Sequence, residues 1–434
     1  METKLERIAS KSRANPKLRF TSIAHLLTKD LVAKHLLKMA SRSAAGTDGQ
    51  TVNDCRASFD DWIGPMLESV HRKGYKAPPV RRVEIPKPGR KEKRPIGVPT
   101  VADRALQGAV AEILSAIYEQ DFLANSFGGR PKSSCHHAII NIADVIQRRK
   151  INWVVECDLK NFFGSMTHEW IMQFVSHRVG DPRVLNLIQR WLRSGVVKDD
   201  VWEPSEVGTP QGGPISVLLS NIYLHYSLDL WFTKVVKPNL KGESELVRYL
   251  DDFVILFEKE SDARSVLSAI DARVGKFDLA LNYDKTRIIP FGRYSKEKKQ
   301  APGNFQFLGF NLHETTSRRG KFRVGLKAAR DRIHRATTKL KVEIMRNRHA
   351  PIAWQIKRIN QSLRGIFNYF CFSDCVRDQW RTQYAIMKTW YRALSTRSQR
   401  RLPWQKYFVI LKWNPLQKTG VRIKYDAFDL YLRL

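Results

Sequence analysis

Two adjacent acidic residues interrupt an apolar stretch near the middle of the chain. Asp251 and Asp252 stand in the segment RYLDDFVILF, between the apolar runs 246–249 and 253–257. The runs predict two short strands around an acidic turn, although the turn lacks the Asn-Gly or Asp-Gly pair typical of tight hairpins. Neighbouring carboxylates repel each other, and an unpaired charge is unfavourable in an apolar setting. The pair therefore predicts a cation at this hairpin.

A third carboxylate supports this interpretation. Asp158 ends the apolar run of NWVVECDL, as it would at the end of a buried strand. Carboxylates brought together from separate strand ends are what a two-metal site for nucleotidyl transfer requires, and Mg²⁺ prefers oxygen ligands. The alternative is an ordinary polar turn, because Asp pairs also occur at 60–61 and 199–200. The hairpin context and Asp158 favour the metal site.

The charge balance indicates a polyanionic partner. Among 434 residues there are 75 Lys and Arg against 42 Asp and Glu, a net charge of +33. An excess of this size is typical of proteins that bind nucleic acid. We expect no membrane partner and a cytoplasmic protein, because the chain lacks an apolar run of membrane-spanning length and a signal peptide. Its five scattered cysteines predict reduced thiols.

Turn signals and apolar periodicity outline the elements. Residues 81–99 predict a hairpin with a charged loop, and Thr100 with Asp103 matches a capping box before a helix. We expect helices within 165–195 and a buried helix after the Gly/Pro-rich loop that begins at 207. One strand is expected over 305–312. Beyond about residue 325, the pattern predicts a basic, all-helical region with helices near 354–370 and 376–395.

Several motifs occur in a familiar order. They are RPIGVPTVADRALQ, NSFGGRPKSSCHHAI, VVECDLKNFF, GTPQGGPISVLLSNIYL, RYLDDFVIL, LNYDKTRIIPF and FQFLGF, followed by SLRGIFNYF and LPWQKYF. Together these motifs resemble the blocks of group II intron reverse transcriptases and their maturase region, over about residues 20–412. The early AGTDGQTV resembles the N-terminal extension of the same enzymes.

The resemblance implies an α+β fold of the right-hand polymerase type. It places an N-terminal extension with the first fingers helices at 1–75 and the fingers and palm at 76–320. A helical, maturase-like thumb is expected at 321–412 and a short C-terminal remnant at 413–434. The predicted activity is RNA-directed and DNA-directed DNA synthesis.

The resemblance also implies roles for individual residues. Asp158, Asp251 and Asp252 would hold two Mg²⁺ ions, for which Mn²⁺ could substitute, and the backbone carbonyl of Leu159 would add a ligand. Phe163 matches the gate that excludes a ribose 2′-hydroxyl. The remaining dNTP-binding candidates are Gln211, Arg94, Lys87 and Arg104, and those near the template and primer are Tyr249, Leu250, Gly212 and Lys285.

Three positions depart from the family pattern. Leu250 stands where mobile intron enzymes usually carry Ala, Gly164 where they carry Asp, and Gly129 where they carry an aromatic residue. These departures favour a free-standing host enzyme that uses RNA and DNA template-primers and dNTPs in DNA repair, end joining or phage defence. The first alternative is an intron-encoded maturase that also binds a group II intron RNA. The second is a catalytically inactive RNA-binding splicing factor.

Overall fold

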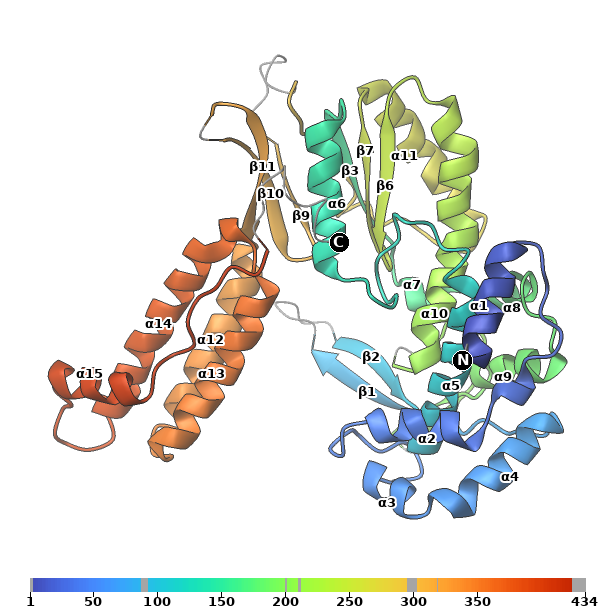
Figure 1. Ribbon diagram of the computed structural model, residues 1–434, viewed down its shortest axis with the longest axis horizontal. Coiled ribbons are helices and arrows are strands. Elements are labelled where there is room, and N and C mark those ends of the chain that lie inside the picture. The colour runs from blue at the N-terminus through green and yellow to red at the C-terminus, as the bar shows by residue number, and fades with distance from the viewer. Residues whose placement is uncertain are drawn as a thin grey trace. The chain divides into compact units, whose positions relative to one another are not determined.

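The computed structural model describes residues 3–86, 93–199, 201–209, 212–294, 303–317 and 319–423. The chain divides into two compact units. The first comprises Met1–Asn141 and Val154–Ile288, and the second comprises Ile142–Trp153 and Ile289–Leu434. Helices and sheets are mixed, which confirms the α+β class (Figure 1). Within the described ranges, no helix is both long enough and apolar enough to cross a membrane.

A four-stranded sheet carries the three acidic residues singled out in the sequence. Its order is β6-β7-β3-β8, with β6 at Ser244–Tyr249, β7 at Asp252–Phe257, β3 at Trp153–Asp158 and β8 at Arg287–Pro290 (Figure 1). The predicted hairpin is confirmed, because β6 and β7 pair antiparallel with Tyr249 opposite Asp252. Residues 253–257 are all buried, and α11 (Glu260–Gly275) packs against β7. The continuous apolar run therefore reflects a strand covered on both faces.

A second sheet lies near the N-terminal helices. Its order is β2-β1-β4-β5, and β1 (Val80–Pro86) and β2 (Lys93–Val98) form the predicted hairpin. Strands β4 (Val196–Lys198) and β5 (Val201–Glu203) complete it. The other helices of this region are α1 (Lys4–Ala14), α2 (Lys29–Lys38), α3 (Val52–Ala57) and α4 (Phe59–His71).

Helix α5 (Val101–Tyr118) is the buried centre of the first unit and contacts α1, α2 and α10. The Thr100 hydroxyl caps it by accepting from the Asp103 amide, as predicted. The prediction of a full capping box is wrong, because the Asp103 carboxylate does not bond back to the Thr100 amide but turns into the core. There it accepts from Tyr75 Oη at 2.8 Å, Trp191 Nε1 at 2.6 Å and Gln107 Nε2 at 3.0 Å. These three side-chain donors compensate for its burial.

The helical prediction for 165–195 is confirmed as two helices, α8 (His168–Ser176) and α9 (Pro182–Leu192). Asp181 caps α9 and also accepts from the amides of Ile23 and Ala24. The buried helix expected after residue 207 is α10 (Pro214–Leu224), which continues into π-helical turns at His225–Asp229 and Phe232–Val236. Two further helices are α6 (Cys135–Arg148) and α7 (Phe162–Ser165).

The second unit contains a three-stranded sheet in the order β11-β10-β9. The prediction of a single strand over 305–312 is wrong, because this segment forms two strands. Leu308 and Gly309 have φ of +48° and +78°, and they break the segment into β9 (Asn304–Phe307) and β10 (Phe310–Thr316). The apolar run continued through the turn, so strand periodicity could not reveal it. Strand β11 (Phe322–Ala328) pairs with β10.

The helices expected near 354–370 and 376–395 are present as α13 (Ile352–Tyr369) and α14 (Val376–Ser395). The same region also contains α12 (Arg330–Arg346) and α15 (Trp404–Trp413), and α12, α13 and α14 contact one another (Figure 1). One apolar stripe from each builds a common core, in which Trp390 is fully buried and donates through Nε1 to Gln355 Oε1 at 2.8 Å. None of the five cysteines, all of which lie in the described ranges, forms a disulfide.

Candidate active site

The three carboxylates predicted to bind metal lie where neighbouring strands end and begin. Asp158 is the last residue of β3, Asp252 is the first of β7, and Asp251 occupies the turn between β6 and β7. Burial raises the pKa of the Asp251 carboxyl, and the negative charge of Asp158 raises it further. Arg94 and Lys285 oppose that rise. The fold thus brings residues separated by 93 positions close enough for their charges to interact.

A loop after α11 holds Asp158. Lys285 Nζ forms an ion pair with Asp158 Oδ2, and Asn282 Nδ2 donates to the same oxygen at 3.0 Å. The Asn282 amide donates to the Asp158 carbonyl at 2.8 Å, and Leu159 forms a bridge with Leu281. Both Lys285 and the backbone of Leu159 therefore lie beside the first carboxylate. Sequence reasoning missed Asn282, although it precedes Lys285 by three residues in the same motif.

Glu156 is a further acidic neighbour that the sequence analysis did not single out. It precedes Asp158 by two residues on β3, a spacing that places both side chains on one face of the sheet. Arg287 pairs with Glu156 at 2.7 Å, whereas burial raises the pKa of Glu156. Strand periodicity was the signal that could have identified it.

The donor chemistry of this corner fits a hard divalent cation. Carboxylate oxygens are the ligands that Mg²⁺ prefers, and a cation would relieve the burial and repulsion that raise the pKa of Asp251. In the part of the chain that the structure describes, no group of three or more His, Cys, Asp or Glu side chains forms a ready-made metal cage. The ammonium of Lys285 instead provides the positive charge beside Asp158.

The turn that carries Asp251 is strained. Leu250 has a φ of +57°, in the left-handed region that non-glycine residues rarely adopt. Such a conformation is unfavourable by roughly 1–2 kcal/mol, so surrounding contacts must hold it in place. One of them is a hydrogen bond from Arg248 Nη1 to the Leu250 carbonyl at 3.2 Å.

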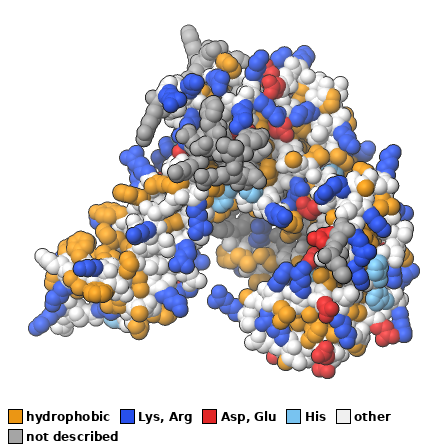
Figure 2. Space-filling view, viewed as in Figure 1, with side chains coloured by type: hydrophobic (Ala, Val, Ile, Leu, Met, Phe, Trp, Pro, Cys, Tyr) orange, Lys and Arg blue, Asp and Glu red, His pale blue; other side chains and the backbone are white. Residues whose placement is uncertain are grey.

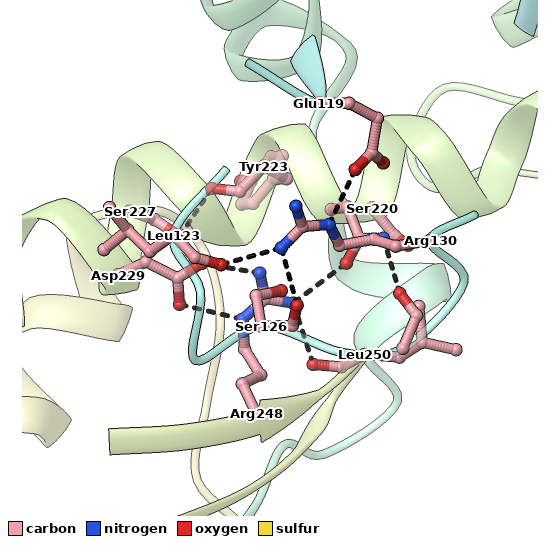
Figure 3. Close-up of polar contacts among 12 residues, drawn as sticks. Glu119, Leu123, Ser126, Arg130, Ser220, Tyr223, Ser227, Asp229, Arg248 and Leu250 are labelled. Carbon is pink, nitrogen blue, oxygen red and sulfur yellow. Dashed lines mark hydrogen bonds and ion pairs between the residues drawn. The ribbon is translucent and has the colours of Figure 1, made fainter. Parts of the chain in front are cut away.

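Arg248 is fully buried and anchors the turn to the helical layer (Figure 3). Its Nε donates to Asp229 Oδ1 at 2.8 Å and its Nη2 pairs with Asp229 Oδ2 at 2.5 Å. Its Nη1 also donates to Asn221 Oδ1 at 3.0 Å. One guanidinium therefore connects the β6–β7 turn with α10 and the π-helical turn that follows it. The sequence offered only the position of Arg248 at the start of the RYLDDFVIL motif.

A second arginine ties the segment 123–130 to the same place (Figure 3). Arg130 pairs with Glu119 at 2.9 Å and donates to the carbonyls of Leu123 and Ser126, each at 2.7 Å. The backbone of Arg248 bonds that of Phe127 and Asn125, both at 2.9 Å. This segment consequently runs alongside the end of β6.

Two of the departures from the family pattern meet at this turn. A Cβ built on Gly128 would lie 2.4 Å from the Leu250 nitrogen and 2.8 Å from its Cγ. A Cβ on Gly129 would lie 3.3 Å from Leu250 Cδ2 and 2.3 Å from Val217 Cγ1, and Gly129 has a φ of +70°. A large side chain at 129 would therefore compete with that of Leu250. At the third departure, a Cβ on Gly164 would lie 2.5 Å from Asn161 Nδ2.

The proposed sugar gate lies just beyond β3. Phe162 is buried against Tyr223, whereas Phe163 is only half-buried, and the Thr209 amide donates to the Phe163 carbonyl at 2.9 Å. The loop that follows approaches β2, because a Cβ on Gly212 would lie 2.5 Å from the Gly97 carbonyl oxygen. The glycine permits this close backbone packing. Gln211 lies outside the described residues.

The predicted triphosphate-binding residues have different positions. Arg94 is exposed near the start of β2, and its charge acts on Asp251. Arg104 donates to the Ala44 carbonyl at 2.6 Å, a contact that belongs to the packing of the N-terminal region, and burial lowers its pKa. Lys87 lies outside the described residues. Tyr249 is half-buried at the end of β6, next to Leu250.

Comparison with known proteins identifies the family that the sequence motifs resemble. Residues 85–312 match the model described as reverse transcriptase (RNA-dependent DNA polymerase). Protein YkfC of Escherichia coli is 29% identical over 359 residues, 73% of this chain and 90% of YkfC. Group II intron-encoded protein LtrA of Lactococcus lactis is 34% identical over 305 residues, 68% of this chain and 50% of LtrA. An uncharacterized 91 kDa protein in the cob intron of Schizosaccharomyces pombe is 30% identical over 243 residues, 55% of this chain and 29% of that protein.

The chain therefore belongs to the reverse transcriptase family. Its similarity to LtrA and the other intron protein makes it a group II intron-like member, as the motifs predicted. The chain covers most of YkfC but half or less of these two intron relatives.

Proposed function

We propose that this protein synthesises DNA from dNTPs on RNA and DNA templates by two-metal nucleotidyl transfer. The supporting observation is that Asp158 at the end of β3 and Asp251 and Asp252 at the β6–β7 turn lie on adjacent strands of one sheet. This arrangement occurs in a chain of the reverse transcriptase family. A catalytically inactive RNA-binding splicing factor would have no need of these gathered carboxylates.

Asp158, Asp251 and Asp252 would hold two Mg²⁺ ions, with the Leu159 carbonyl as a further ligand and Mn²⁺ as a substitute. When bound, such ions activate the primer 3′-hydroxyl and stabilise the leaving pyrophosphate. Asn282 and Lys285 orient Asp158 through the bonds to its Oδ2. Arg248 orients the turn that presents the other two carboxylates.

Substrate recognition is assigned to the residues around this corner. We infer that Phe163 excludes the ribose 2′-hydroxyl and that Arg94 binds the triphosphate, because arginine suits phosphate contacts. Gln211, Lys87 and Arg104 remain predicted dNTP contacts. Tyr249, Leu250, Gly212 and Lys285 are proposed to lie near the template and primer.

We assign 1–75 to the N-terminal extension and first fingers helices and 76–320 to the fingers and palm. Residues 321–412 form the proposed thumb, and 413–434 the C-terminal remnant. The thumb would clasp the template-primer duplex. Its contacts with backbone phosphates carry little sequence specificity.

Two biological roles are supported. Leu250, Gly129 and Gly164 favour a free-standing host enzyme for DNA repair, end joining or phage defence. The name of LtrA favours an intron-encoded maturase that also binds a group II intron RNA. A folded intron RNA encoded around the gene would support the maturase, and its absence would support the host role.

Removal of the carboxylates tests the proposed chemistry. We expect Asp251→Asn and Asp252→Asn each to abolish dNTP incorporation on a primed RNA template with Mg²⁺ or Mn²⁺, while duplex binding stays near the parental level. The matched control is Asp199→Asn, because Asp199 is exposed and also stands directly before another Asp. Undiminished synthesis by the Asp251→Asn/Asp252→Asn variant would refute the site assignment.

A further inference from the structure

The solvent-facing side of α14 has an unusual composition. The exposed residues of this 20-residue helix are all basic or aromatic, namely Arg377, Trp380, Arg381, Tyr384, Lys388 and Arg392. They recur every three or four positions, so they form one continuous stripe on the helix. We refer to these six residues as the α14 stripe.

The two rings of the α14 stripe are open to solvent. Trp380 is 64% exposed and Tyr384 is 55% exposed, whereas Trp390 on the opposite face of the helix is fully buried. Four residues separate the two rings, which corresponds to about 6 Å along the helix axis. Large exposed aromatic side chains are unfavourable in water and commonly mark a binding surface.

The charges beside the rings are positive and largely free. Lys388 Nζ lies 4.6 Å from the centre of the Tyr384 ring, a cation–π geometry. Arg381 approaches Asp378 only at 3.9 Å, and Asp378 Oδ2 also accepts from the Ala328 amide at 3.2 Å. Among the residues that the structure describes, Arg377, Lys388 and Arg392 have no acidic partner within ion-pair distance. The stripe therefore offers positive charge to a polyanion.

We propose that the α14 stripe binds single-stranded nucleic acid, with unpaired bases stacked on Trp380 and Tyr384 and phosphates paired with the flanking Lys and Arg. Exposed rings and cations side by side match this ligand, because each base offers a π face and each linkage a negative charge. In a duplex the base faces are already stacked, so only the cations would find partners. The proposal goes beyond DNA synthesis, because it concerns a surface remote in sequence from the carboxylates.

Photocrosslinking can locate the ligand on the full chain. Oligonucleotides of 5-bromouracil, as RNA and as DNA, would be irradiated with the protein, and the adducts mapped by mass spectrometry. We expect adducts on Trp380 or Tyr384 with at least one of the two oligonucleotides. The difference in adduct yield between the RNA and the DNA oligonucleotide identifies the preferred sugar. Adducts confined to other peptides would overturn the proposal.

Binding of labelled oligo-dT and oligo-U, measured by fluorescence anisotropy, tests the energetics. Trp380→Ala/Tyr384→Ala should weaken single-strand binding by about tenfold or more, since stacking contributes strongly to each bound base. Trp380→Phe/Tyr384→Phe should restore most of it, because the rings remain. Trp413→Ala, which removes a 78% exposed ring of α15, is the matched control and should have little effect.

Further comparisons distinguish this proposal from duplex binding, from a protein partner and from the polymerase assignment. Equal weakening of blunt duplex and single strand by the double alanine variant would overturn single-strand recognition. Unchanged single-strand binding would also overturn it and leave a protein partner for the stripe. Asp251→Asn should bind single strands like the parent, so a failure of the polymerase assignment would appear only in dNTP incorporation.

Discussion

At the scale of single residues, the candidate site consists of the three predicted catalytic carboxylates and of the groups that hold them in place. Leu250 adopts a left-handed φ, and Arg248 bonds its carbonyl from inside the core. A buried arginine is tolerated only when its charge is paired and its donors are satisfied. Asp229 and Asn221 meet both requirements. Strain at the turn is thus maintained by a rigid polar anchor.

Replacement of the anchor should therefore impair catalysis. Arg248→Lys keeps a positive charge but cannot reproduce the forked contacts to Asp229, Asn221 and Leu250. We expect kcat for primer extension to fall by about tenfold or more, because small misplacements of reacting groups can have effects of about 100-fold. The KM for template-primer should change little, and the Mg²⁺ concentration for half-maximal activity should rise.

The control for this variant is Arg264→Lys, in an exposed pair with Glu260 on α11. A thermal melt establishes how much of each protein is folded. If Arg248→Lys lowers stability but leaves the turnover per folded molecule and the Mg²⁺ titration unchanged, Arg248 has only a structural role.

The side chain of Leu250 should influence the choice of primer. Its contact with the Gly128–Gly129 backbone would be lost in Leu250→Ala, which leaves space beside the carboxylates. We expect the ratio between extension of a long annealed primer and extension from a few paired 3′ bases to change several-fold. Leu37→Ala, at an exposed leucine of α2, is the control. Equal ratios in the Leu250 variant and the parent would remove this role.

At the scale of elements, α5 is joined to its neighbours by the buried Asp103. The carboxylate accepts from Tyr75 before β1, Trp191 on α9 and Gln107 on α5 itself. Burial raises its pKa to about 6, although the three hydrogen bonds oppose the rise. In the unfolded chain the pKa of Asp is about 3.9. As the pH falls, Asp103 therefore becomes protonated at a higher pH in the native state than in the unfolded state.

This difference predicts a pH dependence of stability. The contribution of protonated Asp103 should be fully present below about pH 4 and be lost as the pH rises through about 6. Asn does not titrate, so the Tm of the parent minus that of Asp103→Asn should increase as the pH falls from 7.5 to 5. Differential scanning calorimetry checks this. A constant difference over that range would contradict the raised pKa.

At the scale of the whole molecule, we expect the net charge of +33 to govern encounters with nucleic acid, and Figure 2 shows many more basic than acidic side chains on the face in view. Lysine and arginine that neutralise phosphates release counterions, so affinity falls steeply with salt. For six to ten phosphate contacts the expected loss is about 10³- to 10⁵-fold in affinity for template-primer between 50 and 200 mM salt. Anisotropy titrations with a labelled duplex measure it. A change below about tenfold would indicate that few phosphates are contacted.

Local pattern determined much of this protein from the sequence alone. Apolar periodicity and turn residues predict the β6–β7 hairpin, the β1–β2 hairpin, the buried helix α10 and the helical region beyond residue 325. These signals are local, since each depends on neighbours within a few positions. The ordered motifs added the family, which the comparison with known proteins confirmed.

Only the tertiary structure decided which distant residues share an environment. The ion pairs of Arg248 with Asp229 and of Lys285 with Asp158 join residues from separate elements. The close approach of Gly129 to the Leu250 side chain likewise brings distant positions together. Their partners depend on how strands and helices pack, which no local period encodes. The same packing turned Asp103 inward from its expected cap and broke the strand expected over 305–312 at Leu308 and Gly309. The sequence alone thus predicted the acidic turn, and the packing decided what holds it in place.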